Sequence, residues 1–246
     1  MSEIAIIGGT GLTSLKHLEI TRREMVRTPF GEPSGPLTFG TFSGHEVVFL
    51  ARHGYGHTIP PHKVNYRANM WALRETGVKH IIAVAAVGGI AENLQPASLA
   101  IPDQIIDYTW SRVNTFFEEG LSSVVHIDFT EPYCSELRNK LIDASRKANL
   151  DAVESGTYGA TQGPRLETAA EINRLEQDGC TMVGMTGMPE AALARELDIC
   201  YATCAVIANK AAGRSGGKIT MEEIEACLTD GMEKVRTLLE TVIPEL

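Results

Sequence analysis

The 246-residue sequence is poor in basic clusters and long hydrophobic runs. It has 22 Lys and Arg against 31 Asp and Glu, with no block of like charge, which argues against binding to nucleic acid or anionic membranes. The longest apolar run, residues 81–91, contains two glycines and is far shorter than the roughly 20 residues of a membrane-spanning helix. No basic, apolar leader opens the chain, so we expect no signal peptide.

Cysteine is also scarce. The five cysteines form no CxxC pair, and their number is odd. This pattern favours buried thiols in a reducing, cytoplasmic compartment over a disulfide framework or a zinc site. Since 43% of the residues are hydrophobic and 22% are charged, the composition excludes disorder and suits one globular domain over residues 1–246.

Short apolar segments alternate with helical patterns, which predicts an α/β domain with a mixed, largely parallel central sheet flanked by helices. Thr168 with Glu171, and Thr220 with Glu223, have the spacing of capping boxes at helix starts. The expected strands are residues 4–7, 37–40, 46–50, 81–87, 153–161, 182–184 and 199–207. Helices are expected over residues 64–76, 136–148 and 189–197, and from residues 168 and 220 onward.

Small or polar residues follow five of the buried strands. Ligands of open α/β sheets bind beyond the carboxyl ends of strands, where loop amides and helix N-termini meet. We therefore expect one site built from all five strand ends, at residues 8–11, 52–54, 85–89, 184–187 and 208–209.

The glycine-rich turn at residues 8–11 suggests a dinucleotide-binding module, but the third glycine of that fingerprint is missing. A turn that binds an anion through amides and the Thr10 hydroxyl is favoured instead. Residues 213–217 match the G-x-S-x-G pattern of serine hydrolases, which need a histidine later in the chain. The last histidine is His126, so these residues are predicted to form a loop.

Three histidines lie close together in the sequence, at His53, His57 and His62. Glycines and prolines between them prevent a shared helix face, and no carboxylate completes a ligand set, so no metal site is expected. Arg52 and His53 follow a buried strand, where a guanidinium beside a titratable ring suits a phosphate oxygen. The alternative for Arg52 is a surface salt bridge.

Together these motifs resemble the trimeric purine nucleoside phosphorylase family, and in particular its methylthionucleoside branch. The resemblance is carried by residues 7–12, 50–54, 62–69, 163–165, 185–190 and 200–202, in the family's order. It implies cleavage of a nucleoside by inorganic phosphate, without metal or organic cofactor. It also implies that Met185 lies against the ribose, and that phosphate is bound by Thr10, Arg52, His53, Ala85, Ala86 and Thr186.

At the base, the sequence departs from methylthioadenosine phosphorylases. Their Asp-x-Asp is replaced by Asn209, Lys210 and Ala211, and Leu166 with Glu167 is similar to the loop of enzymes specific for 6-oxopurines. An ionised Glu167 accepts from N1–H of hypoxanthine but repels the bare N1 of adenine, while Asn209 donates to N7 and O6. We therefore expect Asn209 and Glu167 to be catalytic, and Leu166 and Ala211 to bind the substrate. The alternative role for Glu167 is a helix cap.

At the 5' end of the sugar, the family's histidine near the start of the last helix is replaced by Met221, with Ile224 one turn on. Such an apolar pocket suits a methylthio group, although Met221 could equally be a core residue. The resemblance implies that His126 enters the site of a neighbouring subunit in a homotrimer.

The expected activity is phosphorolysis of methylthioinosine in purine and methylthio salvage. Methylthioadenosine, or inosine and guanosine, are the alternative substrates. A non-catalytic nucleotide-binding or dehydrogenase-like module is the alternative of another class.

Overall fold

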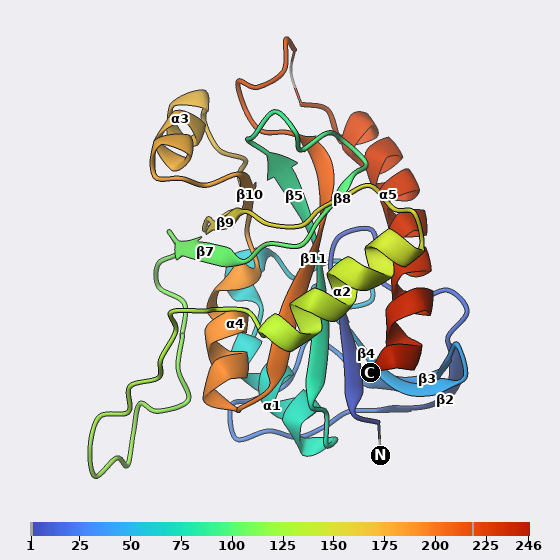
Figure 1. Cartoon of the computed structure of the whole chain (residues 1–246). Coiled ribbons are helices and arrows are strands. Elements are labelled where there is room, and N and C mark those ends of the chain that lie inside the picture. The colour runs from blue at the N-terminus through green and yellow to red at the C-terminus, as the bar shows by residue number, and fades with distance from the viewer. Residues whose placement is uncertain (1, 218) are drawn as a thin grey trace.

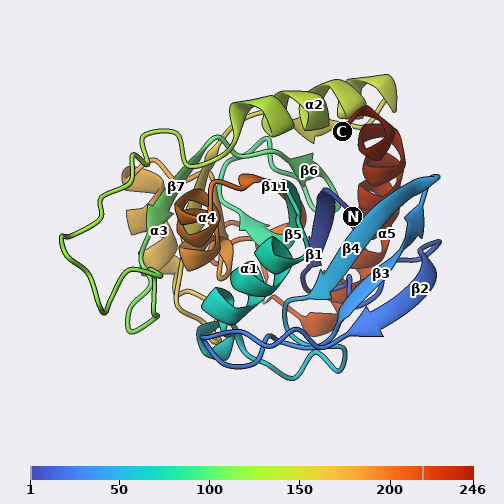
Figure 2. The same ribbon diagram turned by 90° about the horizontal axis from the view of Figure 1, so that it is seen from below.

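A twisted mixed sheet runs through the middle of the molecule, with helices on both faces (Figures 1 and 2). The structure is a computed structural model and describes residues 2–217 and 219–246. Within these residues, the sheet has eleven strands: β1 Ile4–Gly8, β2 Glu19–Glu24, β3 Leu37–Phe42, β4 His45–Ala51, β5 His80–Gly89, β6 Leu99–Ala100, β7 Gln104–Asp107, β8 Ala152–Val153, β9 Thr157–Ala160, β10 Met182–Gly184 and β11 Cys200–Lys210.

Strand β5 is the centre of this sheet. It pairs in parallel with β1 and β11, and its last two residues pair antiparallel with β10. From β1 the sheet continues through β4, β3 and β2, and from β10 it continues through β9 and β7, while β11 leads to β6 and β8. The prediction of a mixed, largely parallel sheet is confirmed.

Each face of the sheet has its own helices. Helices α1 (Tyr66–Glu75) and α4 (Gly187–Glu196) cover one face, and α2 (Ser135–Lys147) and α5 (Met221–Val242) cover the other (Figure 2). Along β1, Ala5 and Ile7 pack with the first pair of helices, and Ile4 and Ile6 with the second. Burial on both faces explains why the central strands are continuously apolar in the sequence. Helix α3 (Ala169–Gln177) lies beside β9 and β10.

The sequence prediction of the strands is wrong at residues 153–161, and it misses strands β2, β6 and β7. The expected strand over residues 153–161 is divided at Gly156, whose φ of +148° interrupts the extended chain. As a result β8 pairs with β6, and β9 pairs with β7 and β10. Strand β2 was not predicted because all six of its residues are exposed, so no apolar pattern marks it.

The expectation that all five cysteines remain thiols is also wrong, because Cys134 and Cys200 form a disulfide. Cys134 precedes α2 and Cys200 begins β11, and the amide of Cys134 donates to the carbonyl of Tyr201 at 2.8 Å. That contact places the two Cα atoms 5.2 Å apart, within disulfide range. The two cysteines are separated by 66 positions in the sequence, so no local spacing signals the pair.

In the described part of the chain, no helix is long and apolar enough to span a bilayer.

Candidate functional site

The five strand ends singled out in the sequence meet at one cavity of about 430 Å³. It opens at the carboxyl ends of β1, β4, β5, β10 and β11. Each of the expected site residues except His126 contributes to its wall: Thr10, Arg52, His53, Ala85, Ala86, Leu166, Glu167, Met185, Thr186, Asn209, Ala211, Met221 and Ile224.

Arg52 is held at this cavity by a buried carboxylate. Its side chain is 1% exposed, so the alternative of a surface salt bridge is wrong. Nε and Nη2 each donate to one oxygen of Glu190 at 2.7 Å, and Nη1 donates to the carbonyl of Val84 at 2.9 Å. Of five guanidinium hydrogens, these bonds use three and leave two for a ligand. Burial alone lowers the pKa of Arg52, but the Glu190 carboxylate outweighs it and the net pKa is raised.

Glycine is required where the first strand ends beside this arginine. A Cβ on Gly9 would lie 2.9 Å from Nη1 of Arg52 and 2.6 Å from the carbonyl oxygen of Val84. The backbone of the glycine-rich turn can therefore approach the guanidinium closely, as an anion shared by both requires.

His53 is a neutral imidazole in this site, and one hydrogen bond fixes its tautomer. Burial, followed by the charge of Arg52, lowers its pKa from 6.5 to about 4. Nδ1 lies 2.8 Å from the carbonyl oxygen of Ile59, and a carbonyl oxygen only accepts, so Nδ1 carries the hydrogen. At neutral pH, Nε2 is therefore an acceptor.

A β-bulge near the end of β11 positions Asn209. Ile207 pairs with Val87 and Asn209 with Gly88, so Ala208 is the extra residue in the strand. Such a bulge redirects the side chains beside it, and Asn209 lines the cavity. One amide N–H of Asn209 donates to the carbonyl of Lys210 at 2.6 Å, which leaves one N–H for a ligand where the sequence argument used both.

Glu167 is not the cap of the following helix. The capping box of α3 is formed by Thr168 and Glu171, which exchange bonds between their side chains and backbone amides. Glu167 lines the cavity, and its Oε1 accepts from the Thr161 hydroxyl at 2.7 Å. No described residue donates a hydrogen bond to its second oxygen, so the carboxylate has an acceptor available for a ligand.

Met185 and Thr186 follow β10, and both line the cavity. Thr186 is the residue before α4, and its hydroxyl makes no capping bond to that helix. Its amide donates to the Tyr158 hydroxyl at 3.3 Å, which fixes the backbone of the turn.

The start of α5 forms an apolar part of the same cavity. Ile224 is buried, whereas Met221 is 63% exposed, so Met221 is not a core residue. The hydroxyl of Thr220 accepts from the amide of Glu223, which sets where the helix begins. The reciprocal bond of the predicted capping box is not formed.

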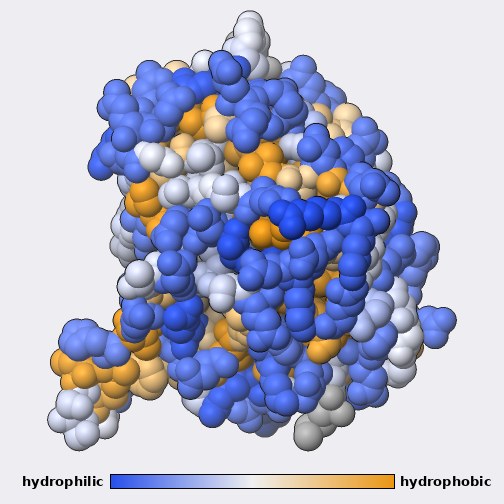
Figure 3. Space-filling view, in the orientation of Figure 1, coloured by the Kyte–Doolittle hydropathy of each residue, from blue (hydrophilic) through white to orange (hydrophobic). Residues whose placement is uncertain are grey.

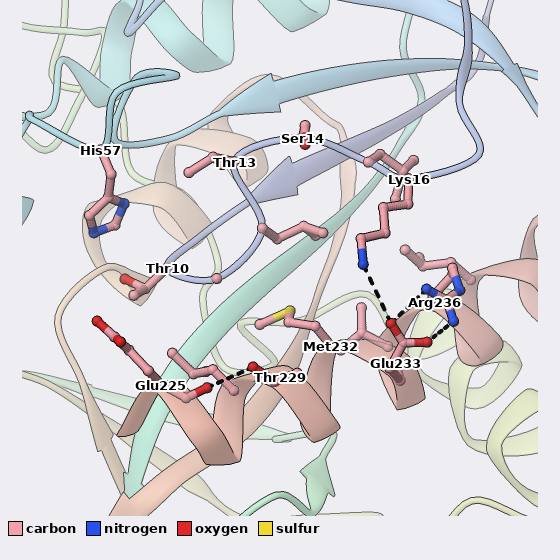
Figure 4. A pocket seen from close by; sticks show the side chains of 16 residues that line it. Thr10, Thr13, Ser14, Lys16, His57, Glu225, Thr229, Met232, Glu233 and Arg236 are labelled. Atoms are coloured by element: carbon pink, nitrogen blue, oxygen red, sulfur yellow. Dashed lines mark hydrogen bonds and ion pairs between the residues drawn. The ribbon is translucent and has the colours of Figure 1, made fainter. Parts of the chain in front are cut away.

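A second cavity of about 450 Å³ adjoins the first, between residues 10–16 and α5 (Figure 4). Thr10 and His57 line both cavities. At its far end, Lys16 and Arg236 are ion-paired with Glu233.

His126 lies outside the cavity, on an arm of residues 108–134 that projects from the molecule without regular secondary structure (Figure 1). The arm also carries large hydrophobic side chains in contact with solvent. They are Trp110, Val113, Leu121, Val124 and Val125. Orange atoms gather on the projection in Figure 3. The chain does not bring its own His126 to the site.

The hydrolase-like and metal-like patterns do not form such sites in the described part of the chain. Residues 213–217 form turns with no elbow between a strand and a helix. The rings of His53 and His57 lie 4.9 Å apart, but the described residues contain no group of three side chains able to hold a metal ion.

Three residues around the site were given no role from the sequence: Glu190, Thr161 and Arg112. The sequence could have identified Glu190, because it is an acid within the apolar residues 188–194. A buried arginine needs such a partner. No sequence feature marks Thr161 or Arg112, because their contacts depend on loop conformation.

Comparison with known proteins agrees with this geometry. The model of the family described as Phosphorylase superfamily matches residues 3–244. A probable S-methyl-5'-thioinosine phosphorylase from Pseudomonas syringae pv. tomato is 52% identical over 99% of both chains. A 6-oxopurine nucleoside phosphorylase from Pyrococcus furiosus is 49% identical over 99% of this chain and 93% of its own. The solved methylthioadenosine phosphorylase from Schistosoma mansoni with adenine has a TM-score of 0.95 and 32% identity, over 100% of this chain and 92% of its own.

Proposed function

This chain belongs to the phosphorylase superfamily, and we propose that it cleaves S-methyl-5'-thioinosine with inorganic phosphate. The products are hypoxanthine and 5-methylthioribose 1-phosphate. The observation that carries the proposal is Glu167, which stands in the cavity with one carboxylate oxygen bound by Thr161 and the other available. The names of the relatives from Pseudomonas syringae and Pyrococcus furiosus support a 6-oxopurine as the base.

Base choice follows from hydrogen-bond polarity. Hypoxanthine has a hydrogen on N1, which an ionised Glu167 accepts, whereas adenine presents a lone pair at N1 that repels the carboxylate. The remaining N–H of Asn209 donates to N7 or O6 of the purine. As the C1'–N9 bond breaks, its electron pair moves into the purine, and this donor stabilises the negative charge.

Phosphate is bound beneath C1' by Arg52, Thr10 and Thr186. The hydroxyls and the two remaining guanidinium hydrogens donate to its oxygens, while neutral His53 accepts from the O–H of monohydrogen phosphate. One phosphate oxygen forms the new bond to C1' while the purine leaves. Holding phosphate and the nucleoside in contact and correctly oriented supplies much of the rate enhancement.

The 5' end of the substrate distinguishes a methylthio sugar from an ordinary ribose. Met221 and Ile224 offer no hydrogen bond to a 5'-hydroxyl, and a thioether packs well against the methionine sulfur. Their place in the cavity supports methylthioinosine over inosine.

We further propose a cytoplasmic homotrimer that needs no metal or organic cofactor, with phosphate as co-substrate. The exposed hydrophobic side chains on the 108–134 arm support an interface between copies of this chain. In that assembly, His126 completes the 5' pocket of a neighbouring subunit.

The test is a comparison of kcat/KM for methylthioinosine, methylthioadenosine and inosine, each with saturating phosphate. We expect methylthioinosine to be preferred over both. A preference for methylthioadenosine, the substrate class named for the Schistosoma mansoni neighbour, would overturn the base assignment. Equal use of inosine would overturn the role of the apolar pocket, and base release without phosphate would contradict phosphorolysis.

A further inference from the structure

Arg112 lies at the root of the 108–134 arm and joins two loops that line the cavity. Its Nη2 donates to the carbonyl oxygens of Thr161 at 3.2 Å and Gln162 at 2.8 Å, on the loop that follows β9. Its Nη1 donates to the carbonyl oxygens of Met185 at 2.8 Å and Met188 at 2.7 Å, on the segment that follows β10. One side chain therefore bridges two segments that are separate in the sequence.

These two segments carry different parts of the proposed substrate site. The first leads from Thr161, whose hydroxyl binds Glu167, to the base side of the cavity. The second carries Met185 on the sugar side. The two are in close contact, since a Cβ on Gly163 would lie 2.4 Å from the Met185 sulfur. Their relative position therefore sets the distance between base recognition and the sugar.

The contacts of Arg112 require a guanidinium. Besides the four carbonyls, it donates to Oε1 of Gln162 at 3.2 Å and to the Tyr66 hydroxyl at 3.3 Å. Among the described residues, no carboxylate lies within ion-pair distance, so all its partners are neutral acceptors spread around a planar fork. A lysine ammonium, which is a compact point charge with three hydrogens, cannot reach acceptors on both segments in this way.

We propose that Arg112 is a positioning residue that fixes Glu167 relative to the sugar and thereby sets base selectivity. The inference rests on the proposed function of this cavity, and it adds a residue that does not touch the substrate. Because Arg112 acts through the loop, its loss lowers the ratio of kcat/KM between the two purine nucleosides while the chain still folds.

The test compares Arg112→Lys with Arg67→Lys. Arg67 also binds the arm, donating to Glu118 at 2.8 Å and to the carbonyl of Thr115 at 3.4 Å. Within the described part of the chain, it donates no hydrogen bond to the two loops. The measured quantity is the ratio of kcat/KM between methylthioinosine and methylthioadenosine. We expect Arg112→Lys to reduce this ratio about tenfold, the scale for a misplaced polar contact, and Arg67→Lys to leave it unchanged.

A double-mutant cycle separates positioning from simple stabilisation. If Arg112 acts through Glu167, Arg112→Lys has no further effect on the ratio in a Glu167→Gln background. Thr161→Val removes the hydroxyl that binds Glu167 while keeping the Arg112 contacts, and it should reproduce the loss even if Arg112→Lys folds poorly. An unchanged ratio in either Arg112→Lys or Thr161→Val, or additive effects in the cycle, would overturn the proposal.

The wild-type chain alone decides the proposed function, because its preferred nucleoside is measured first. The role of Arg112 is then judged on the ratio between the purine that the wild type prefers and the other one. If the wild type prefers methylthioadenosine, the proposed substrate is contradicted. The ratio between the two nucleosides still tests whether Arg112 controls selectivity.

Discussion

Glu190 accepts two hydrogen bonds from Arg52, one at each carboxylate oxygen and both at 2.7 Å. The Glu190 side chain is fully buried, and it also accepts from the Tyr201 hydroxyl at 2.9 Å. A bidentate pair fixes the plane of the guanidinium as well as its position. The direction in which Arg52 presents its remaining hydrogens to phosphate is therefore set by Glu190.

Glu190→Gln should raise the KM for phosphate and destabilise the fold. Removing one partner of a buried ion pair costs about 3–5 kcal/mol, because the other charge is left uncompensated. Thermal unfolding and phosphate titrations at saturating nucleoside measure the two effects. Tyr201→Phe is the control, since it removes one bond to Glu190 and leaves the pair with Arg52 intact. An unchanged KM for phosphate in Glu190→Gln would contradict this role.

Glu167→Gln should weaken discrimination against methylthioadenosine by about 1–3 kcal/mol, the cost of leaving a buried polar group badly paired. The amide presents both a donor and an acceptor at the position of the carboxylate, so neither purine is repelled. The ratio of kcat/KM for the two nucleosides measures this change. Glu171→Gln is the matched control, because Gln can still accept from the Thr168 amide and the change removes a carboxylate charge outside the cavity wall, so the ratio should stay unaltered.

Met221→Gln should reduce the preference for methylthioinosine over inosine by about 1–2 kcal/mol, since an amide replaces the thioether that faces the methylthio group. Met221 is mostly exposed, so the free energy of unfolding should change little. The ratio of kcat/KM for these two nucleosides measures the effect. Glu222→Gln, at the next residue of α5 and outside the cavity wall, should leave the ratio unchanged.

Prediction from sequence succeeded where one physical rule fixes the outcome. Continuous apolar runs gave the buried strands β1, β5 and β11, because parallel strands are covered on both faces. The rule that ligands bind at carboxyl strand ends then identified the region of the cavity. Thr168 with Glu171 gave the start of α3, since a capping box depends only on neighbours in the chain.

Prediction failed where the contact joins distant parts of the chain. The disulfide between Cys134 and Cys200 depends on the place of α2 beside β11, which no spacing reveals. The same is true of Arg112, because its acceptors are backbone carbonyls that every residue carries. Arg52 was placed correctly at the cavity, but its burial and its partner Glu190 follow from tertiary packing.

The stability of the fold should decrease in mild acid because of His53. Its pKa is about 4 in the folded chain against an ordinary value of 6.5, so the unfolded chain takes up a proton first as the pH falls. Between pH 6.5 and about 4, this difference in proton uptake lowers the free energy of unfolding by about 3 kcal/mol. Urea unfolding at several pH values should give a smaller decrease for His53→Gln than for the wild type. Parallel curves for the two proteins would contradict the pKa shift.

Val124→Asp should dissociate the proposed trimer. Val124 is 74% exposed on the arm, and a carboxylate buried without a partner at an interface opposes association. Light scattering after size-exclusion chromatography measures the mass of the assembly. Ile20→Asp is the control, because Ile20 is also an exposed hydrophobic residue, 51% accessible, but lies on β2 away from the arm.

The same experiment distinguishes a shared active site from a merely associated one. If His126 completes the 5' pocket of a neighbour, dissociated Val124→Asp loses activity on methylthioinosine while keeping its thermal stability. His126→Ala should then remain trimeric and show a raised KM for methylthioinosine, because only the contact with the substrate is removed. In mixed trimers of His126→Ala and Glu167→Gln subunits, some sites combine an intact Glu167 from one subunit with an intact His126 from its neighbour. The kcat/KM for methylthioinosine should therefore exceed that of either variant alone. A fully active Val124→Asp monomer would show that each chain forms its site alone.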